Sequence, residues 1–303
     1  VPGEGTPAVT ETKGNQDSYY IQDNITMLSG KLILVGGLRW NRYDTITRDA
    51  VPRTTVAFDD SKLIGRWGAV YKPVSFVSLY YNYSESFVFS TATFLGGPRT
   101  GQIFDPSVGK NYEVGIKSET SNGMLFGSIS AFDLSLTNVA FTFVLPDGSS
   151  GRDQQGKEKN KGLGFDVGLN LKSPAGPVQT ILTYYKGDIK NAVNVKPLGA
   201  VNNSWSLFVA QSVARGPLKG MKVGGGVFRK SEVLFSVPAP INSYNGPAYT
   251  TSSGFFTYER AHYKLALNVD NLADDKFIEG GENGTWLVLN PGRTFKFSVA
   301  YRF

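Results

Sequence analysis

The chain carries few side chains that could perform covalent chemistry. It has a single histidine, His262, and no cysteine, which excludes disulfides, thiolate metal sites and multi-histidine zinc sites. A serine hydrolase needs its histidine beside an exposed serine, whereas His262 lies next to the short turn at Arg260 and shares a strand face with Lys264. We therefore expect no catalytic residue and a protein that is not an enzyme.

Two acidic pairs and two glycine runs could instead hold an ion or a phosphate. They are Asp59-Asp60, Asp274-Asp275, Gly36-Gly37 and 224–226. Neither acidic pair sits in a loop with several spaced oxygen ligands, as calcium sites do. The glycine runs lack the following helix and the Lys-Ser/Thr of phosphate loops. We interpret the acids as turn residues and the glycines as strand positions that permit bending, and we expect neither a metal nor a cofactor.

The composition favours β structure. The 303 residues include 35 Gly, 15 Tyr and 20 Phe, and their number suits one large all-β unit or two ordinary domains. The net charge of +6 is modest and the basic residues are dispersed, which argues against nucleic acid as a partner. The sequence contains no run of 18 apolar residues, so it predicts no transmembrane helix. The chain begins at Val1 without a signal peptide or a methionine, so we expect a mature or cut chain.

Thirteen strand-like segments follow a polar N-terminal run, 1–16, that we expect to be a loop. They are 17–28, 31–43, 58–72, 74–87, 110–120, 123–138, 161–172, 177–188, 203–215, 218–232, 250–259, 261–271 and 293–303. The last one alternates without an error and places Phe295, Phe297 and Val299 on one face. Strands of soluble sandwiches and of membrane barrels both alternate in this way, so this segment alone leaves both architectures open.

The connections between the segments alternate between short and long. Tight-turn residues make up the short ones, and the long ones are 44–57, 88–109, 139–160, 189–202, 233–249 and 272–292. Bacterial outer-membrane barrels have short periplasmic turns and long outer loops, so the alternation favours an antiparallel transmembrane β-barrel. Such barrels have even strand numbers. Thirteen segments therefore predict an incomplete barrel cut within an outer loop, unless one strand is miscounted.

The two faces of the segments differ in polarity. Leu38 and Trp40 alternate with Arg39 and Asn41, and charged side chains would be costly in lipid, so the charged face should line a polar lumen. Several tyrosines lie near segment ends and predict an interfacial girdle. They are Tyr80, Tyr81, Tyr83, Tyr258, Tyr263 and Tyr301.

Short motifs in a fixed order carry a family resemblance. They are YYIQD (19–23), GGLRWNRY (36–43), YSESF (83–87), DP (105–106), YEVGIK (112–117), AFD (131–133), TNV (137–139), GLGF (162–165), NVDNLADDKF (268–277) and PGR (291–293) with the closing strand. Together they resemble TonB-dependent outer-membrane receptors, and within these the ferric-siderophore receptors. One position departs from the pattern, because Gly164 replaces the usual glutamate.

The resemblance implies a barrel of about 22 strands around a plug domain in the outer membrane. Within it, 17–303 would be the C-terminal part of the barrel and 1–16 the remnant of an extracellular loop, with the plug and the TonB box missing. The implied partners are a ferric siderophore, membrane lipid, TonB through the missing plug, and the barrel-insertion machinery, which would read Phe303. A passive porin-like channel and a structural or adhesive barrel remain alternatives.

A siderophore already saturates its iron, so the resemblance implies aromatic and polar contacts and no metal ligands from the protein. The predicted ligand-binding residues lie in the long outer connections. They are Phe87, Phe89, Phe94, Arg99, Phe104, Tyr244, Tyr249 and Trp286. Packing within the loops is the alternative for the aromatic residues. Arg99, Arg152 and Lys157 could attract an anionic chelate, with solvated surface charge as the alternative.

Overall fold

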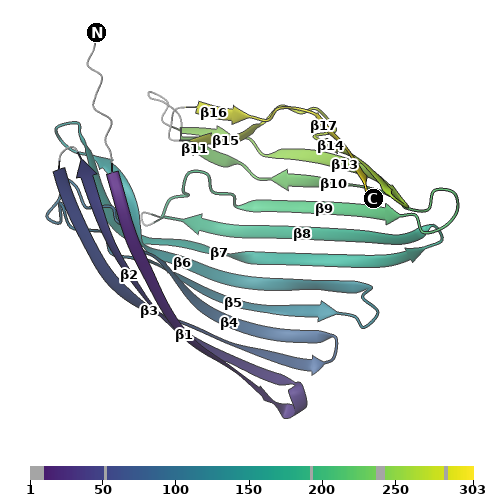
Figure 1. Cartoon of the computed structure of the whole chain (residues 1–303), viewed down its shortest axis with the longest axis horizontal. Helices are drawn as coiled ribbons and strands as arrows, with labels where there is room; N and C mark the ends of the chain where they lie inside the picture. The colour runs from purple at the N-terminus through teal and green to yellow at the C-terminus, as the bar shows by residue number, and fades with distance from the viewer. Residues whose placement is uncertain (1–9, 51–52, 192–193, 237–242, 283–285) are drawn as a thin grey trace, which may run out of the picture. The chain divides into compact units, whose positions relative to one another are not determined.

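The computed structural model describes residues 10–50, 53–191, 194–236, 243–282 and 286–303. Thirteen strands form one antiparallel sheet in the order β1 to β10, β13, β14, β17 (Figure 1). They are β1 (Thr10–Met27), β2 (Leu32–Ala50), β3 (Arg53–Val74), β4 (Val77–Val88), β5 (Ser107–Glu119), β6 (Leu125–Val144), β7 (Ser150–Ser173), β8 (Gly176–Lys190), β9 (Asn203–Ser212), β10 (Met221–Lys230), β13 (Tyr249–Arg260), β14 (Tyr263–Asp270) and β17 (Thr294–Tyr301). The sheet is not closed, since β1 and β17 are its two edges.

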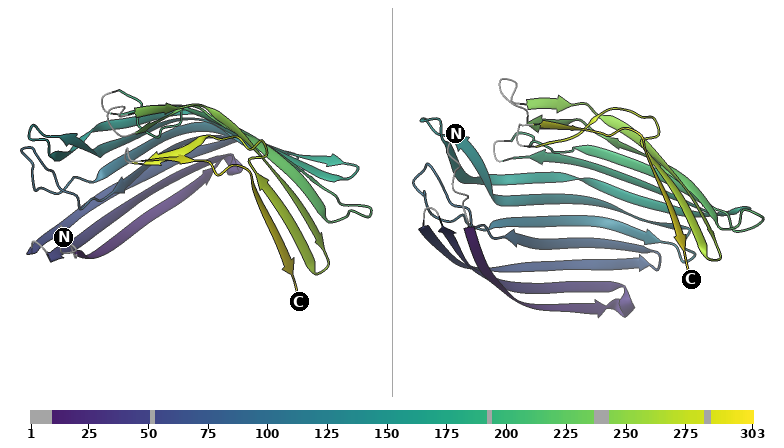
Figure 2. Two further views of the ribbon diagram at one scale, coloured as in Figure 1. Left: turned by 90° about the horizontal axis from the view of Figure 1, so that it is seen from above. Right: turned by 45° about the horizontal axis from the view of Figure 1, so that its top comes forward.

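Three small elements complete the described structure. A single 3-10 turn, η1 (Leu28–Gly30), connects β1 to β2. Two hairpins, β11 (Val233–Ser236) with β12 (Ser243–Gly246) and β15 (Ile278–Glu282) with β16 (Trp286–Leu289), lie within long connections, and β11 lies against β15 (Figure 2). Within the described ranges no helix is long and apolar enough to cross a membrane.

Cross-strand pairing follows the alternation of the sequence. In the β1–β2 pair, Tyr19 lies opposite Trp40, and the two rings stack with centroids 5.9 Å apart. In the β14–β17 pair, Leu267 lies opposite Phe297. A one-residue slip would exchange the two faces, so matched apolar pairs fix the register wherever the faces differ in polarity.

All thirteen predicted strands are present, but several are longer than predicted. Residues 10–16, expected to be loop, belong to β1, and the rest of that expected loop lies outside the described residues. The prediction of a long connection at 44–57 was also wrong, because β2 continues to Ala50 and β3 begins at Arg53. Likewise β6 and β7 leave only 145–149 of the connection 139–160. These extensions are polar on both faces, so the sequence shows no apolar alternation there. The strands continue all the same, because their backbone groups still form hydrogen bonds with the neighbouring strand.

The chain divides into two compact units. Unit 1 comprises Val1–Val70, Tyr81–Tyr112 and Leu134–Glu158, and unit 2 comprises Tyr71–Tyr80, Glu113–Asp133 and Lys159–Phe303. Among the residues that the structure describes, the buried apolar side chains are Phe94 and Phe104 in unit 1 and Ala210, Val233 and Phe235 in unit 2. Many large apolar side chains of the strands are exposed instead, as expected for strands that face lipid.

Candidate ligand-binding region

In unit 1 the sheet has one apolar and one polar face. Ile21 and Leu38 lie opposite each other on β1 and β2, and their side chains are 73% and 52% exposed. Alternate positions place Ser18, Arg39 and Asn41 on the other face. There the Ser18 hydroxyl donates to Asn41 Oδ1 at 2.9 Å and accepts from Arg39 Nη2 at 3.0 Å. These three polar side chains therefore satisfy one another with hydrogen bonds, and the apolar face is the one that lipid would cover.

Unit 2 repeats this division at β14 and β17. Leu267 and Phe297 form an apolar pair, and Phe297 is 68% exposed. Lys296 lies on the opposite face, where its Nζ is 3.6 Å from Asp270 Oδ2. Both units thus carry the alternation that the sequence predicts for a barrel wall.

The predicted tyrosine girdle needs one correction. Tyr81 and Tyr83 contact the half-exposed ring of Trp67, with centroids 5.2 and 5.5 Å away. Tyr80, one position along β4, faces the other way and donates its hydroxyl to the Glu113 carboxylate. Adjacent strand residues point to opposite faces, so Tyr80 belongs to the polar face and not to the girdle.

The outer connection 89–106 has a core of its own. Phe94 and Phe104 are only 3% and 2% exposed, and their rings meet edge to face with centroids 4.6 Å apart. The Arg99 guanidinium lies 4.0 Å above the Phe94 ring, and its Nη1 is 3.0 Å from Asp105 Oδ2. Phe94 and Phe104 thus fill the interior of the loop, and the exposed Arg99 side chain covers the Phe94 ring. Contact with a ligand stays a prediction for all three.

This loop is anchored to β7 by main-chain pairing. Leu95 and Arg152 exchange two backbone hydrogen bonds of 2.9 Å each. The side-chain amide of Gln154 adds two further hydrogen bonds: its Oε1 accepts from the Asp105 N–H at 2.8 Å, and its Nε2 donates to the Asp105 carbonyl at 2.7 Å. The anchor holds the loop against the outer end of the sheet in unit 1. The Arg152 and Lys157 side chains are exposed, and attraction of an anion by them stays a prediction.

Two further predicted residues, Phe87 and Phe89, belong to a cluster of four aromatic rings. Phe89 lies 4.7 Å from Phe87, 5.4 Å from Tyr43 and 6.1 Å from Phe58, measured between ring centroids. All four side chains are partly exposed. Such a cluster offers flat apolar surface next to polar strands, which suits stacking against a planar or bulky ligand. We call these four residues the aromatic cluster.

Two members of this cluster, Tyr43 and Phe58, were not among the ligand-binding residues predicted from the sequence. Tyr43 and Phe58 flank the connection that was expected to be a long loop, whereas the structure extends β2 and β3 on both sides of 51–52. The sequence did contain a signal for their contact, because Tyr43 and Phe58 are aromatic residues at the two ends of a mainly polar stretch. If that stretch continues the hairpin, the two residues lie on neighbouring strands and can pack together.

The remaining predicted residues lie on the outer elements of unit 2. The Tyr249 ring stacks on Phe277 with centroids 3.9 Å apart, and Lys230 Nζ lies 5.3 Å from the Tyr249 ring. Tyr244 is partly exposed on β12. Trp286 is the first residue of β16. Ligand contact stays a prediction for Tyr244, Tyr249 and Trp286.

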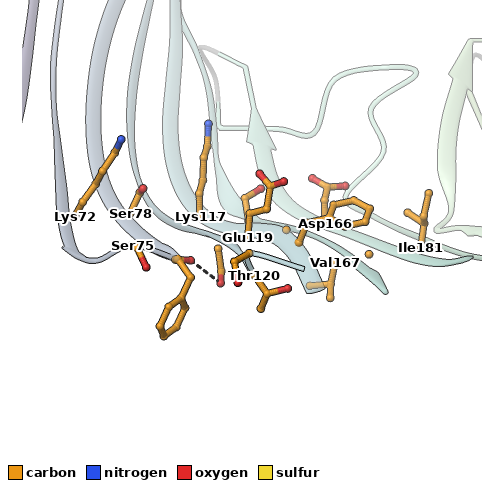
Figure 3. A pocket seen from close by; sticks show the side chains of 16 residues that line it. Lys72, Ser75, Ser78, Lys117, Glu119, Thr120, Asp166, Val167 and Ile181 are labelled. Atoms are coloured by element: carbon orange, nitrogen blue, oxygen red, sulfur yellow. Dashed lines mark hydrogen bonds between the residues drawn. The ribbon is translucent and has the colours of Figure 1, made fainter. Parts of the chain in front are cut away.

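A hollow of about 570 Å³ opens in unit 2 near the short turns (Figure 3). The Lys72, Ser78 and Lys117 side chains point the same way from neighbouring strands, and Asp166 also lines the hollow. Glycine makes room for an aromatic ring here, because a Cβ on Gly168 would lie 2.1 Å from Phe126 Cζ. The hollow offers both charges and hydroxyl groups to a polar occupant.

His262 and Phe303 lie at the last strand. His262 Nδ1 is 2.9 Å from the Arg302 carbonyl, and the Arg302 N–H donates to the His262 carbonyl. His262 therefore ties the short turn to the end of β17. Phe303 is fully exposed and meets Tyr301 edge to face at 5.1 Å. A role of Phe303 as an insertion signal stays a prediction. In the part of the chain that the structure describes, no three acidic, histidine or cysteine side chains cluster as metal ligands would.

Known proteins share this sequence pattern and this fold. The family model described as TonB dependent receptor-like, beta-barrel, matches residues 2–272. The "Ferrichrome outer membrane transporter/phage receptor" of Escherichia coli K12 is 27% identical over 311 residues, which cover 100% of this chain and 40% of the relative. The "Ferrioxamine B receptor" of Salmonella typhimurium is 23% identical, covering 96% of this chain and 41% of the relative.

Solved structures agree on the fold. The pyoverdine outer-membrane receptor FpvA from Pseudomonas aeruginosa PAO1, bound to pyoverdine, superposes with a TM-score of 0.83 at 22% identity, covering 100% of this chain and 44% of the receptor. The ferric-catecholate import receptor Fiu from Escherichia coli K12 gives a TM-score of 0.75 at 19% identity, covering 96% and 45%. The chain spans less than half the length of these relatives. The family consists of receptors and transporters rather than enzymes. The match over most of the chain, together with the antiparallel two-faced sheet, shows that the chain belongs to the TonB-dependent receptor β-barrel family.

Proposed function

We propose that the chain is the barrel part of a longer outer-membrane receptor that takes up a ferric siderophore with energy delivered through TonB. The observation that carries this proposal is the match to the receptor barrel family over residues 2–272. Relatives named for ferrichrome and ferrioxamine B support the choice of cargo. The strands place a partly exposed aromatic cluster at the outer ends of β2, β3 and β4, where an incoming ligand arrives first.

Uptake of this kind needs binding and passage, without covalent chemistry by the protein. The chelate brings its iron fully ligated, so the receptor supplies flat apolar contacts and hydrogen bonds rather than metal ligands. In unit 1 the aromatic cluster supplies the first, and the polar face with Ser18, Arg39 and Asn41 supplies the second. We propose no catalytic residue and no resident cofactor.

The other partners follow from the faces and the family. Membrane lipid would cover the apolar face that includes Ile21, Leu38 and Phe297. The barrel-insertion machinery would bind the final strand at Phe303. TonB would act through a plug outside this chain, and no feature of the charge distribution favours nucleic acid.

Growth assays with the whole natural protein test the proposal. The receptor would be expressed in a bacterium that lacks its own siderophore receptors and is starved of iron, and a panel of ferric siderophores would be supplied one at a time. We expect growth with at least one ferric siderophore, and only in cells with a functional TonB. Uptake of small sugars independent of TonB, without siderophore-dependent growth, would favour a passive channel instead.

A further inference from the structure

Two outer segments of unit 1 are fastened to each other, namely the connection 89–106 and the tip of the β6–β7 hairpin, residues 143–154. The connection leaves β4 and returns in β5, yet it pairs with β7, which lies beyond β6 in the sheet order. We call the two segments together the outer lobe. Strands β4 to β7 are all interior to the sheet, so no part of the lobe lies on the open edges β1 and β17.

Main-chain hydrogen bonds join the lobe on both sides of one short segment. Phe94 donates its N–H to the Gln102 carbonyl and accepts from the Gly101 N–H, each at 2.9 Å, which closes the connection on itself. The next residue, Leu95, exchanges its two hydrogen bonds with Arg152 of β7. The middle of the connection is therefore paired on one side with its own return and on the other side with β7.

Apolar contacts reinforce this pairing. The buried rings of Phe94 and Phe104 meet inside the connection. Gly96, at a positive φ of 84°, lies against Leu145 at the tip of the hairpin, since a Cβ on Gly96 would lie 2.6 Å from Leu145 Cδ2. The tip of the hairpin thus packs directly on the turn of the connection.

Polar side chains close the base of the lobe. Besides its two hydrogen bonds to Asp105, Gln154 Nε2 donates to the Asn138 carbonyl at 3.0 Å. Asn138, at a positive φ of 57°, donates its amide to the Pro106 carbonyl at 2.9 Å. These residues belong to the DP and TNV motifs of the sequence, which lie outside the aromatic cluster. The two motifs therefore hold the return of the connection against β6 and β7.

The aromatic cluster adjoins the lobe through a single residue. Phe89 begins the connection, and the Phe104 N–H donates to the Ala92 carbonyl at 2.9 Å three residues later. The rings that Phe89 meets on β2 and β3, Tyr43 and Phe58, do not belong to the lobe. The cluster thus lies where the lobe meets the neighbouring strands.

We propose that the outer lobe stays one body throughout uptake, so that the connection 89–106 does not separate from the β6–β7 hairpin when a ligand reaches or leaves the aromatic cluster. Separation would break the two Leu95–Arg152 and the two Gln154–Asp105 hydrogen bonds at once and leave their groups unpaired. A ligand then passes on the side of the cluster, where ring contacts alone join Phe89 to the neighbouring strands. The part of this inference that concerns a ligand rests on the proposed function.

A reversible cross-link in the whole natural protein tests the proposal. Two residues that exchange both main-chain hydrogen bonds have Cα atoms about 5.5 Å apart, which is within the range of a disulfide. This chain contains no cysteine, so Leu95→Cys combined with Arg152→Cys introduces its first two thiols. Uptake of the radiolabelled ferric siderophore that the growth panel identifies is measured in oxidised and in reduced cells. We expect complete oxidation to leave the uptake rate of this double variant unchanged.

The reduced form of the double variant is its own reference, because the loss of the Arg152 side chain affects both forms equally. Thr12→Cys combined with Thr47→Cys is the matched control. These two residues face each other on β1 and β2 with their hydroxyl oxygens 3.2 Å apart, so their disulfide joins strands that are already paired. Uptake that oxidation abolishes and reduction restores, in the first variant only, would overturn the proposal. So would a failure of the first pair of thiols to join under conditions in which the control pair does.

Hydrogen exchange in the ligand-free protein separates this inference from the proposed function. Gln154→Ala should speed exchange by about tenfold in both 93–104 and 150–154, because several neutral hydrogen bonds of one cooperative unit are lost. Lys157→Gln changes an exposed side chain on the same strand and should leave both rates unchanged. Faster exchange in only one of the two segments would show that the lobe is not a single body. If no ferric siderophore were taken up, the proposed function would fail, and the exchange rates would still decide whether the lobe is one body.

Discussion

Phe89 stacks on Tyr43 with ring centroids 5.4 Å apart and 12° between the ring planes. The first residue follows β4 and the second lies within β2, so the contact joins a loop to a strand two positions away in the sheet. Phe89 also touches Phe87 and Phe58. It is therefore the one ring that meets the three other members of the aromatic cluster.

We predict that Phe89→Ala weakens binding of the ferric siderophore that the growth panel identifies, by about tenfold, as expected for loss of a central aromatic contact. Tyr43→Phe keeps the stacked ring and should bind normally, which makes it the matched control. Binding of radiolabelled chelate to whole cells measures both. Wild-type affinity in Phe89→Ala would place the ligand elsewhere.

A second prediction concerns the interior of the loop 89–106. Phe104→Ala removes one of two buried rings, at a cost of about 3–5 kcal/mol for a well-packed phenylalanine, and should open the loop without unfolding the strands. External protease should then cut the loop faster, while heat-modifiable migration of the protein stays normal. Val88→Ala, at an exposed site nearby, should leave cleavage unchanged. Equal cleavage rates in both variants would contradict a loop core.

A third prediction concerns Asn271, which is 4% exposed and lies at a positive φ of 53°. Its amide donates to the Asp275 carbonyl at 2.8 Å and to Asn290 Oδ1 at 2.9 Å, and it accepts from the Asp275 N–H at 3.1 Å. Asn271 thus joins the start and the end of the connection between β14 and β17. Asn271→Ala should destabilise the fold by about 1–3 kcal/mol, since buried partners lose their hydrogen bonds.

Asn271→Gly separates the hydrogen bonds from the backbone conformation, because glycine adopts a positive φ without strain. We expect it to lose stability through the missing amide alone, and therefore less than alanine loses. Urea titration of the folded gel band in detergent measures both variants. If the glycine variant were as stable as the natural protein, the amide contacts would contribute nothing.

A fourth prediction concerns acid stability. The Arg293 N–H donates to Asp274 Oδ1 at 2.7 Å and Lys276 Nζ lies 3.8 Å from the same oxygen, and both hold the pKa of this loop carboxyl below its ordinary value. A carboxyl with a lowered pKa stabilises the fold above its unfolded-state pKa. That contribution is lost as the pH falls through the lower, folded-state pKa.

Asp274→Asn should therefore flatten the fall in thermal midpoint below about pH 4, the ordinary range of an aspartate. Asp275→Asn changes the neighbouring carboxyl and serves as the control. The measurement is the thermal unfolding midpoint of the natural protein and of both variants, taken in steps from neutral to acid pH. An unchanged pH profile in Asp274→Asn would mean that the two contacts do not affect stability.

The sequence predicted the strands well and the outer region poorly. Strands such as β14 and β17 were clear because apolar and polar residues alternate wherever the two faces meet different surroundings. The extensions of β2 and β7 carry polar residues on both faces, so periodicity could not reveal them. For the same reason, the pairing of Tyr43 with Phe89 was not visible.

The candidate site could also be predicted only in part, because residue type does not show which loop aromatics pack inward. Aromatic type made Phe87, Phe89, Phe94 and Phe104 equal candidates for ligand contact. It could not show that Phe87 and Phe89 share one partly exposed cluster, whereas Phe94 and Phe104 fill the interior of their own loop. Whether a loop aromatic packs inward depends on where the loop is anchored, and a single sequence does not state that.

The loop 89–106 is fastened to β7 in part by main-chain groups, which bears on how freely its sequence can vary. Leu95 and Arg152 are joined through their main-chain groups, which every residue except proline possesses. The Leu95–Arg152 part of the attachment therefore does not depend on which side chains stand at these two positions, whereas the Gln154 part does. The residues at the tip of the loop can therefore be substituted while the backbone hydrogen bonds that hold the loop to β7 are kept.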